Sequence, residues 1–435
     1  MDAAGELQIE SKSESEGERK HARQTEPTMK PKTFMLIAGE PSGDLLAAEL
    51  IHALRAEFAA AAPVFTTDYQ PLPAALEPCF IGAGGPLMAK AGVRLACDLT
   101  EHSVIGFSDV VRNILKFRRL LRRLYDLALE HQPDAIVCVD FSGFNRRLAH
   151  AVKTYVRKRL DWFHDWDPRI VQYVSPQVWA SREGRARQMA YDYDLLLSIF
   201  PFERDWYAKH VPKLRVEFVG HPIVDRYGAL PTEPRRADLT PGVVLLPGSR
   251  PAELARHIPV MLRAFELLGA DASIAPAAPK LRALMVMPNE PLAQMARSFQ
   301  PPDSVSIQVG DLATALSAAR LAIACTGTVT MECAWFGVST VALYKTSWTT
   351  YQVAKRLVKV PYLAMPNLLA GEELFPEFIQ TSATAENIAQ AARVLLRDDA
   401  RRARIKTKLA EIIASLGPPG AARRAAGYLR AVLYR

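Results

Sequence analysis

The sequence predicts an α/β protein made of two doubly wound domains that face each other across a cleft. Its 435 residues exceed what one hydrophobic core usually serves. Short apolar segments typical of parallel strands alternate with helical segments. This cycle restarts after a stretch rich in Pro and charge at residues 228–242, which indicates a boundary between two domains.

The first domain is predicted to span residues 32–228. Residues 1–31 form a polar tract with almost no apolar side chains, and we expect a disordered tail there. At Thr33 the pattern changes to an apolar strand, a Gly-containing turn and a helix with apolar residues at helical spacing. The strand candidates of this domain lie at residues 33–38, 79–84, 134–141, 169–174, 194–200 and 215–220.

The second domain is predicted to span residues 243–415 and to be followed by a C-terminal helix at 416–435. Its strand candidates begin at Val243, Ala283, Leu321 and Thr340. In doubly wound sheets, ligands bind at the carboxyl ends of the strands. Two such domains that face each other therefore place the active site in the cleft between them.

Charge and composition narrow the class of partner. The net charge of +8 and the pI near 9.2 favour an anionic partner, which could be nucleic acid, a phosphorylated small substrate or an acidic membrane surface. Neither zinc-finger spacing nor an RNP-like aromatic pattern is present, which argues against nucleic acid. The five cysteines are odd in number and lie mostly in apolar sequence, which suits buried thiols in a reducing compartment.

The sequence predicts neither a membrane span nor a secretory signal. No apolar run approaches the roughly 18 residues that a span needs. The N-terminus carries acidic residues and lacks an apolar core segment. We therefore expect a cytoplasmic protein.

The turn from Gly39 to Asp44 joins the first predicted strand to its helix. Its small residues, with Glu40 and Ser42 among them, would let a ligand approach a helix N-terminus. A turn of this kind is more often structural than catalytic, with the Asp or Ser acting only as a cap. Both interpretations remain open on this motif alone.

Asp140 ends the apolar run AIVCVD, residues 135–140, and thus lies at the carboxyl edge of the first sheet. A carboxylate there can act as a general base, because an attacking hydroxyl must lose its proton as it reacts. Asp140 could equally cap the helix that follows.

Two turns of the second domain suit a phosphate group. Gly248, Ser249 and Arg250 follow the first strand there, and an Arg guanidinium matches phosphate oxygens and can stabilise a departing diphosphate. A lone Arg after a turn is more often a surface residue. The second turn places Thr326, Gly327 and Thr328 at a helix start, where backbone amides can bind phosphate. One turn later, Glu332 could accept hydrogen bonds from ribose hydroxyls or simply be an exposed helical carboxylate.

Residues 113–127 predict an amphipathic helix with a basic face. Ile114, Phe117, Leu121 and Leu124 share one side of this helix. The basic side carries Arg112, Lys116, Arg119 and Arg123. Basic amphipathic helices can dock at an acidic membrane surface, although most such helices merely cover a sheet.

Together, these pieces resemble the lipid-A-disaccharide synthase family from about residue 33 to residue 380. The matching segments are AGEPSGD, GAGGPLM, SVIGFSDV, YVSPQVWA, FPFE, GHPIVD, LPGSR, TGTVTMECAWFGVSTVALYK and KRLVKVPYLAMPNLLAG. None is unique alone, but they occur in register across both predicted domains. The resemblance implies a GT-B glycosyltransferase with two Rossmann-like domains.

The resemblance also implies a reaction. It would be the inverting transfer of 2,3-diacylglucosamine from its UDP donor to 2,3-diacylglucosamine 1-phosphate (lipid X), which gives lipid A disaccharide 1-phosphate and UDP. The first domain would hold the acceptor and the second UDP. The resemblance implies no cofactor and no metal. It does imply association with the inner membrane surface and a possible homodimer. A nucleotide-sugar epimerase or hydrolase of the same fold is the alternative, and a non-catalytic membrane scaffold is a further one.

Family positions assign roles residue by residue. The catalytically important positions fall on Glu40, Ser42, Asp44, Asp140, Arg250 and Asn367. By this likeness Asp140 is the base for the acceptor 6-hydroxyl, and Arg250 with the turn from Thr326 to Glu332 would bind UDP. Glu40 and Asp44 would shape the acceptor site, and Asn367 would orient groups near the reacting carbon.

The chain departs from the family pattern at three places. Gly143 stands where the family often has a second acidic residue, which leaves only Asp140 as the carboxylate of that motif. Ser181 stands where an aromatic residue is common after VWA, and residues 160–168 form an added loop. The resemblance therefore leaves room for a different acceptor or acyl-chain preference.

Overall fold

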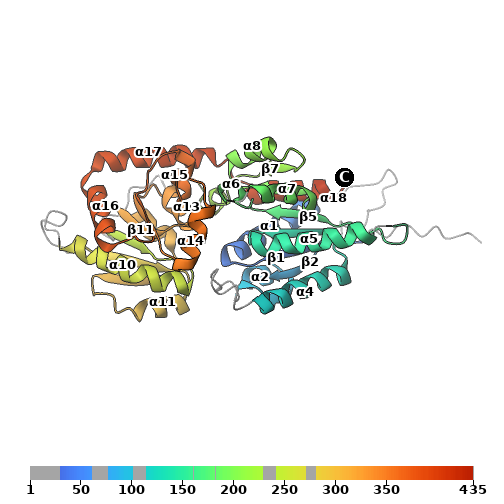
Figure 1. Cartoon of the computed structure of the whole chain (residues 1–435), viewed down its shortest axis with the longest axis horizontal. Helices are drawn as coiled ribbons and strands as arrows, with labels where there is room; N and C mark the ends of the chain where they lie inside the picture. The colour runs from blue at the N-terminus through green and yellow to red at the C-terminus, as the bar shows by residue number, and fades with distance from the viewer. Residues whose placement is uncertain are drawn as a thin grey trace, which may run out of the picture.

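The structure is a computed structural model that describes residues 30–60, 77–100, 114–159, 161–181, 183–228, 242–270 and 281–434. Nearly all of the predicted tail and most of the predicted linker at 228–242 lie outside these residues. The described residues form two α/β domains that lie side by side along the long axis of the molecule (Figure 1). The predicted fold class is confirmed.

The first domain is built on seven parallel strands in the order β3-β2-β1-β4-β5-β6-β7. The strands are β1 (Thr33–Ala38), β2 (Cys79–Gly84), β3 (Arg94–Asp98), β4 (Ala135–Val139), β5 (Arg169–Tyr173), β6 (Leu195–Ser198) and β7 (Val216–Phe218). All five residues of β4 are buried, as expected for a central strand covered on both faces. The strand order reverses between β1 and β4, and ligands of such folds bind at that point.

Helices cover this sheet and begin at its carboxyl edge. They are α1 (Pro41–Ala60), α2 (Pro86–Lys90), α4 (Ile114–His131), α5 (Ser142–Arg159), α6 (Val178–Ser181), α7 (Gly184–Asp192), α8 (Pro201–His210) and α9 (Ile223–Tyr227). The turns before α1 and α5 follow β1 and β4, so they meet where the strand order reverses.

The second domain repeats this plan with six parallel strands in the order β10-β9-β8-β11-β12-β13. The strands are β8 (Val243–Leu246), β9 (Ala283–Met287), β10 (Val305–Val309), β11 (Leu321–Cys325), β12 (Thr340–Tyr344) and β13 (Glu377–Ile379). The helices are α10 (Pro251–Gly269), α11 (Glu290–Arg297), α12 (Leu312–Ala318), α13 (Thr328–Trp335), α14 (Trp348–Leu357), α15 (Met365–Ala370), α16 (Ala385–Arg397) and α17 (Asp399–Ser415).

The chain returns to the first domain at its C-terminal end. After α17, helix α18 (Ala421–Leu433) packs against α1 (Figure 1). Asp225 accepts a hydrogen bond from the backbone N–H of Ala421 at 2.8 Å, and Arg430 pairs with Glu57 at 3.0 Å. Helix α18 therefore follows the second domain in sequence but packs on the first domain in space.

The added loop places two aromatic side chains in solvent. Asp161 and His164 pair across a tight turn, and the intervening Trp162 and Phe163 are 94% and 86% exposed. Trp166 fixes the far side of the loop by donating a hydrogen bond to the carbonyl oxygen of Pro133 at 3.0 Å. The described part of the loop that the sequence predicts as added is thus a surface turn of the first domain.

Candidate functional site

An ion pair joins the two domains at the ends of their first strands. Glu40 follows β1, and Arg250 follows the turn after β8. Arg250 Nη2 lies 2.7 Å from Glu40 Oε2, and Arg250 Nη1 lies 3.2 Å from Glu253 Oε1. The carboxyl edges of both sheets therefore meet here, as the sequence predicts for the active site.

Asp140 follows β4 in a strained backbone conformation. Its φ is 48° and that of Phe141 is 42°, a left-handed conformation that costs about 1–3 kcal/mol for a residue other than glycine. Two buried amides hold the Asp140 carbonyl oxygen. Asn145 Nδ2 donates to it at 2.9 Å and Gln172 Nε2 at 3.1 Å. Strain held by a dedicated network is typical of functional sites.

The environment of Asp140 suits a general base. Its side chain is only partly accessible to solvent, and surrounding protein atoms desolvate the carboxylate. This burial raises the pKa of Asp140 to about 6, the nearby Glu40 carboxylate raises it too, and the Arg250 guanidinium opposes the rise. A base is most efficient when its pKa lies near the working pH. Asp140 is thus tuned closer to neutrality than an ordinary aspartate.

The turn before α1 lies directly against the Asp140 turn. A Cβ on Gly39 would meet the Phe141 ring at 2.3 Å, so only glycine fits there. Ser42 lies in the first turn of α1 and is half-buried. Glu40, Ser42 and Asp140 are therefore brought to one edge of the first sheet.

Glu253 organises the turn that carries Gly248, Ser249 and Arg250. Its carboxylate accepts a hydrogen bond from the Ser249 backbone N–H at 3.3 Å as well as pairing with Arg250. Gly248 has a φ of 127°, and a Cβ there would meet Glu253 Oε2 at 2.6 Å. The glycine therefore allows the turn to close around the carboxylate.

His257 is a buried support of the same turn that the sequence analysis did not identify. Its Nδ1 lies 2.7 Å from the Pro247 carbonyl oxygen, and its Nε2 lies 2.9 Å from the Lys345 backbone nitrogen. A carbonyl can only accept and an N–H can only donate, so the ring must be neutral with its proton on Nδ1. Burial lowers the pKa of His257, which favours this form. The ring thus ties the turn after β8 to the end of β12.

We expect His257→Ala to weaken both folding and donor binding. The substitution removes the partners of two backbone groups, one buried and one partly buried, each worth roughly 1–3 kcal/mol, so the free energy of unfolding should fall by about 2–6 kcal/mol. The loosened turn should also raise the KM for the nucleotide donor more than it lowers kcat. Denaturant unfolding and steady-state kinetics measure the two effects. A loss of stability with an unchanged donor KM would show that His257 does not position the turn.

The turn before α13 leaves its first amides accessible. Gly327, with a φ of 153°, caps α13, and both Gly327 and Thr328 are exposed. Thr326 anchors the turn by donating its backbone N–H to the Leu343 carbonyl oxygen at 3.0 Å. Glu332 accepts a hydrogen bond from the Tyr227 hydroxyl at 2.9 Å, and burial raises the pKa of Glu332. Glu332, the predicted hydrogen-bond partner of the ribose hydroxyls, therefore also links the second domain to α9 of the first.

Two predicted site residues use their polar atoms in hydrogen bonds within the protein. Asp44 is 2% exposed and accepts hydrogen bonds from three N–H groups around the start of α2. Asn367 is fully buried and makes four hydrogen bonds, to Leu374, Glu377 and twice to Phe375. The structure does not bring either side chain to the Glu40–Arg250 pair, and we expect both to shape the loops around the site.

A buried polar cluster supports the loop that leads into α6. The Trp179 indole donates to Glu203 Oε1 at 3.0 Å, and the Tyr207 hydroxyl donates to the Pro176 carbonyl oxygen at 3.1 Å. Glu203 is 1% exposed, and burial raises its pKa to about 7, with the Trp179 hydrogen bond opposing this rise. The cluster fixes the loop beside the Asp140 turn.

We expect the free energy of unfolding of Glu203→Gln to increase relative to that of wild type as pH rises from about 4.5 to 7. The folded pKa lies above the unfolded value, so wild type loses stability over this window while the neutral variant does not. The full change in the stability difference should be about 3 kcal/mol. Unfolding of both proteins at pH 5 and pH 8 measures it. A pH-independent difference would contradict this assignment.

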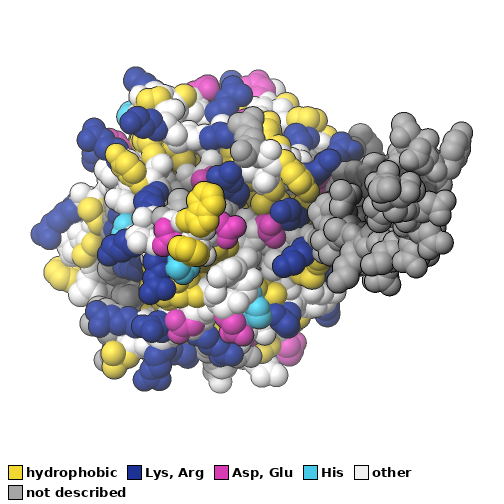
Figure 2. Space-filling view, turned by 90° about the vertical axis from the view of Figure 1, so that its right-hand side faces the viewer, with side chains coloured by type: hydrophobic (Ala, Val, Ile, Leu, Met, Phe, Trp, Pro, Cys, Tyr) yellow, Lys and Arg dark blue, Asp and Glu magenta, His cyan; other side chains and the backbone are white. Residues whose placement is uncertain are grey.

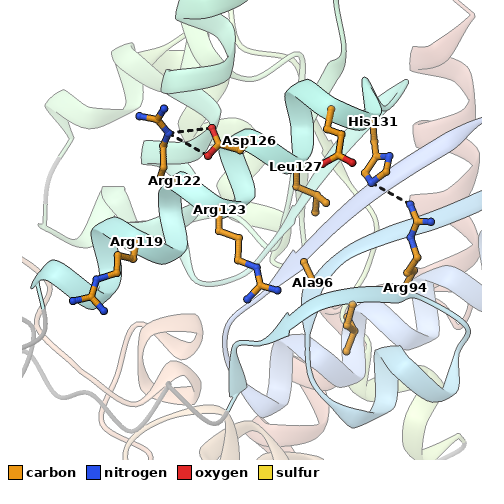
Figure 3. Close-up of a pocket in the computed structure, with 10 residues that line it drawn as sticks. Arg94, Ala96, Arg119, Arg122, Arg123, Asp126, Leu127 and His131 are labelled. Atoms are coloured by element: carbon orange, nitrogen blue, oxygen red, sulfur yellow. Dashed lines mark hydrogen bonds and ion pairs between the residues drawn. The ribbon is translucent and has the colours of Figure 1, made fainter.

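The basic helix α4 forms one side of a pocket of about 650 Å³ at the edge of the first sheet. In Figure 3, Arg122 pairs with Asp126 while Arg123 reaches from α4 toward the strand that carries Ala96. Arg94 of that strand lies 3.1 Å from the His131 ring. Among the predicted basic residues, Arg119 and Arg123 line this pocket, Lys116 is exposed on the same helix, and Arg112 lies outside the described residues.

The surroundings of α4 are both basic and partly apolar. Leu115 is 63% exposed at the start of the helix, whereas Leu124 is fully buried against the sheet. Figure 2, which looks at the end of the molecule formed by the first domain, shows Lys and Arg side chains spread over this face with hydrophobic side chains between them. No helix in the described part of the chain is long and apolar enough to cross a membrane.

Solved structures share this two-domain fold at low sequence identity. A Staphylococcus aureus MnaA-UDP co-structure aligns with a TM-score of 0.56 and 12% identity, covering 93% of this chain and 97% of that one. CalG4, the calicheamicin glycosyltransferase, aligns with a TM-score of 0.54 and 16% identity, covering 94% and 99%. A UDP-GlcNAc 2-epimerase from Neisseria meningitidis aligns at 0.55 with 11% identity, covering 92% and 100%. Both transferases and epimerases thus share the fold, which alone does not separate them.

Sequence relatives distinguish between a transferase and an epimerase for this chain. Lipid-A-disaccharide synthases of Alkalilimnicola ehrlichii and of Anaeromyxobacter sp. strain K are each 35% identical to the chain. The alignments cover 91% of this chain and 97% of the first protein, and 90% and 95% for the second. The model of the lipid-A-disaccharide synthetase family matches residues 34–430. This chain therefore belongs to the lipid-A-disaccharide synthase family of glycosyltransferases.

Proposed function

We propose that the protein transfers 2,3-diacylglucosamine from UDP to the 6-hydroxyl of 2,3-diacylglucosamine 1-phosphate. The products are lipid A disaccharide 1-phosphate and UDP. The observation that carries this proposal is the position of Asp140 beside the Glu40–Arg250 pair, because a base from one domain then faces a phosphate-matching cation from the other. Family membership supports the same reaction over an epimerase or hydrolase.

Asp140 accepts the proton of the acceptor hydroxyl as its oxygen attacks the anomeric carbon of the donor. The bond between that carbon and the β-phosphate oxygen breaks, and UDP leaves with the electron pair. Arg250 offsets the charge that develops on the leaving diphosphate. A single displacement of this kind inverts the anomeric carbon and gives a β linkage.

Arg250 must exchange partners during the cycle. In the structure, its guanidinium is neutralised by Glu40 and Glu253. A diphosphate would compete for the same donors, with the open amides of Gly327 and Thr328 as a second anchor. Glu332 lies one turn along the same helix, where its carboxylate accepts hydrogen bonds from the ribose hydroxyls.

Product analysis tests the reaction directly. The purified protein is incubated with both lipid substrates, and the product is examined by mass spectrometry and NMR. We expect a disaccharide 1-phosphate with a β-1',6 linkage. A free reducing monosaccharide would indicate a hydrolase, and an epimerised UDP-sugar would indicate an epimerase. Either product in place of the disaccharide would overturn the proposal.

We further propose that the protein works at the inner membrane surface, with α4 facing the lipid. Support comes from the exposed basic side chains of Arg119 and Arg123 on α4 and from the exposed Leu115. A homodimer in which α18 is exchanged between two chains is compatible with its position at the end of the chain, and analytical ultracentrifugation measures it.

We expect a double charge reversal, Arg119→Glu with Arg123→Glu, to weaken binding to vesicles that contain phosphatidylglycerol by tenfold or more. Each basic side chain near an anionic surface contributes about 1 kcal/mol. The matched control reverses Arg263 and Lys408, which are exposed on the second domain. Vesicle sedimentation measures binding. Equal losses in both double variants would indicate an effect of net charge and not of α4.

A further inference from the structure

A groove between the two domains lies beside the Asp140 turn. Its volume is about 300 Å³. The first domain contributes the start of α5, the loop before α6 and α6 itself, and the second contributes α14. The lining residues are Ser142, Pro176, Gln177, Val178, Ser181, Arg185, Thr350, Val353, Ala354, Leu357 and Val358.

The walls of this groove are apolar and held in place. One wall is α14, which has no fully buried residue and whose Val353 is 41% exposed. The other wall contains Val178, which is 7% exposed and begins α6, next to the Trp179 side chain that Glu203 holds. A backbone hydrogen bond of 2.9 Å from the Lys359 N–H to the Ala180 carbonyl oxygen joins the two walls.

The groove lies close to the proposed reacting centre. Ser142 lies two residues after Asp140, which places their Cα atoms within about 7 Å. Gln172 donates from one amide nitrogen to the carbonyl oxygens of Asp140 and Val174, at 3.1 and 3.2 Å. The turn that carries the base and the loop that forms the groove are therefore held by the same side chain.

We propose that this groove binds a fatty acyl chain of the acceptor and that Ser181 sets how long a chain it accepts. The inference rests on the proposed function, which supplies an acylated acceptor. Apolar walls suit the chain, and Arg185, which carries the one charge among the described lining residues, matches the acceptor's phosphomonoester. The diphosphate of the donor has its own partner in Arg250 on the opposite side of the cleft.

Ser181 is a small residue of the groove lining, and it is partly exposed at the end of α6. An indole in its place would occupy the space between α6 and α14. The small side chain thus leaves room for additional methylenes.

The test compares wild type, Ser181→Trp and the control Thr349→Trp, with acceptors whose acyl chains increase in length. Thr349 is exposed on α14 and does not line the groove. Each methylene buried by wild type should lower the acceptor KM about fourfold until the groove is full. We expect Ser181→Trp to match wild type with short chains but to have an acceptor KM at least about tenfold higher with long ones. Thr349→Trp should follow wild type throughout.

A second series varies the donor chains at a fixed acceptor. Comparing the three proteins on the same substrate removes any effect of chain length on micelle partitioning. If Ser181→Trp follows wild type with every acceptor, or if it penalises only long donor chains, the inference is overturned. Absence of transfer by wild type with any acceptor would instead contradict the proposed function, so the two failures are distinguishable.

Discussion

Asp140→Asn is expected to lower kcat by roughly 10²–10⁴-fold, the usual contribution of a positioned general base. The amide keeps the shape of the side chain but cannot accept the proton of the attacking hydroxyl. In wild type, kcat/KM should rise with pH through about 6, because burial and Glu40 raise the pKa of Asp140 to that value and only the ionised form acts. Steady-state UDP release over pH 5–8 measures both effects.

The same variant should keep its fold and its affinity for UDP. Because the folded pKa of Asp140 is raised from 3.8 to about 6, ionisation of this carboxyl costs folding stability as pH rises through that range, and the loss is complete above pH 6. Replacing it with a neutral amide should therefore leave the unfolding temperature at pH 8 unchanged or higher. Loss of UDP binding, or a turnover within a few-fold of wild type, would show that Asp140 is not the base.

Arg250→Ala should reduce kcat/KM by about 10²–10³-fold, as for the loss of one donor to a developing anionic charge. It should also shift the acid limb of the pH profile upward, because the guanidinium that lowers the pKa of Asp140 is removed while Glu40 stays. Isothermal titration with UDP and the pH dependence of kcat/KM measure the two consequences.

Glu40→Gln provides the opposite case. It removes a carboxylate that raises the pKa of Asp140 and releases Arg250 from its interdomain partner. The acid limb should therefore move downward, and UDP should bind at least as well as to wild type. Shifts in the same direction for Arg250→Ala and Glu40→Gln would contradict the electrostatic coupling of these three residues.

The sequence predicts the central strands and the edge strand β7, and misses the other three edge strands. β4 and β11 are fully buried, so their sequences are continuous apolar runs. β3, β10 and β13 are edge strands and are not fully buried. One-sided or partial burial breaks the apolar run, which is the signal for a parallel strand.

The sequence also predicts where the site lies better than what each residue does. Strand ends identify Asp140 and Arg250, because the carboxyl edges of parallel sheets meet in the cleft. Sequence cannot show that Asp44 caps α2 or that Asn367 is saturated by backbone groups and the Glu377 carboxylate, since their partners lie in other segments. His257 was missed because nothing in a helical histidine signals its contacts with Pro247 and Lys345.

The most direct test of the central claim is UDP release from UDP-2,3-diacylglucosamine, measured with and without 2,3-diacylglucosamine 1-phosphate. The account predicts that wild type releases UDP only when the acceptor is present, because the leaving group departs as the acceptor hydroxyl attacks. Asp140→Asn should show almost no release in either condition. Equal release by wild type with and without the acceptor would contradict the account.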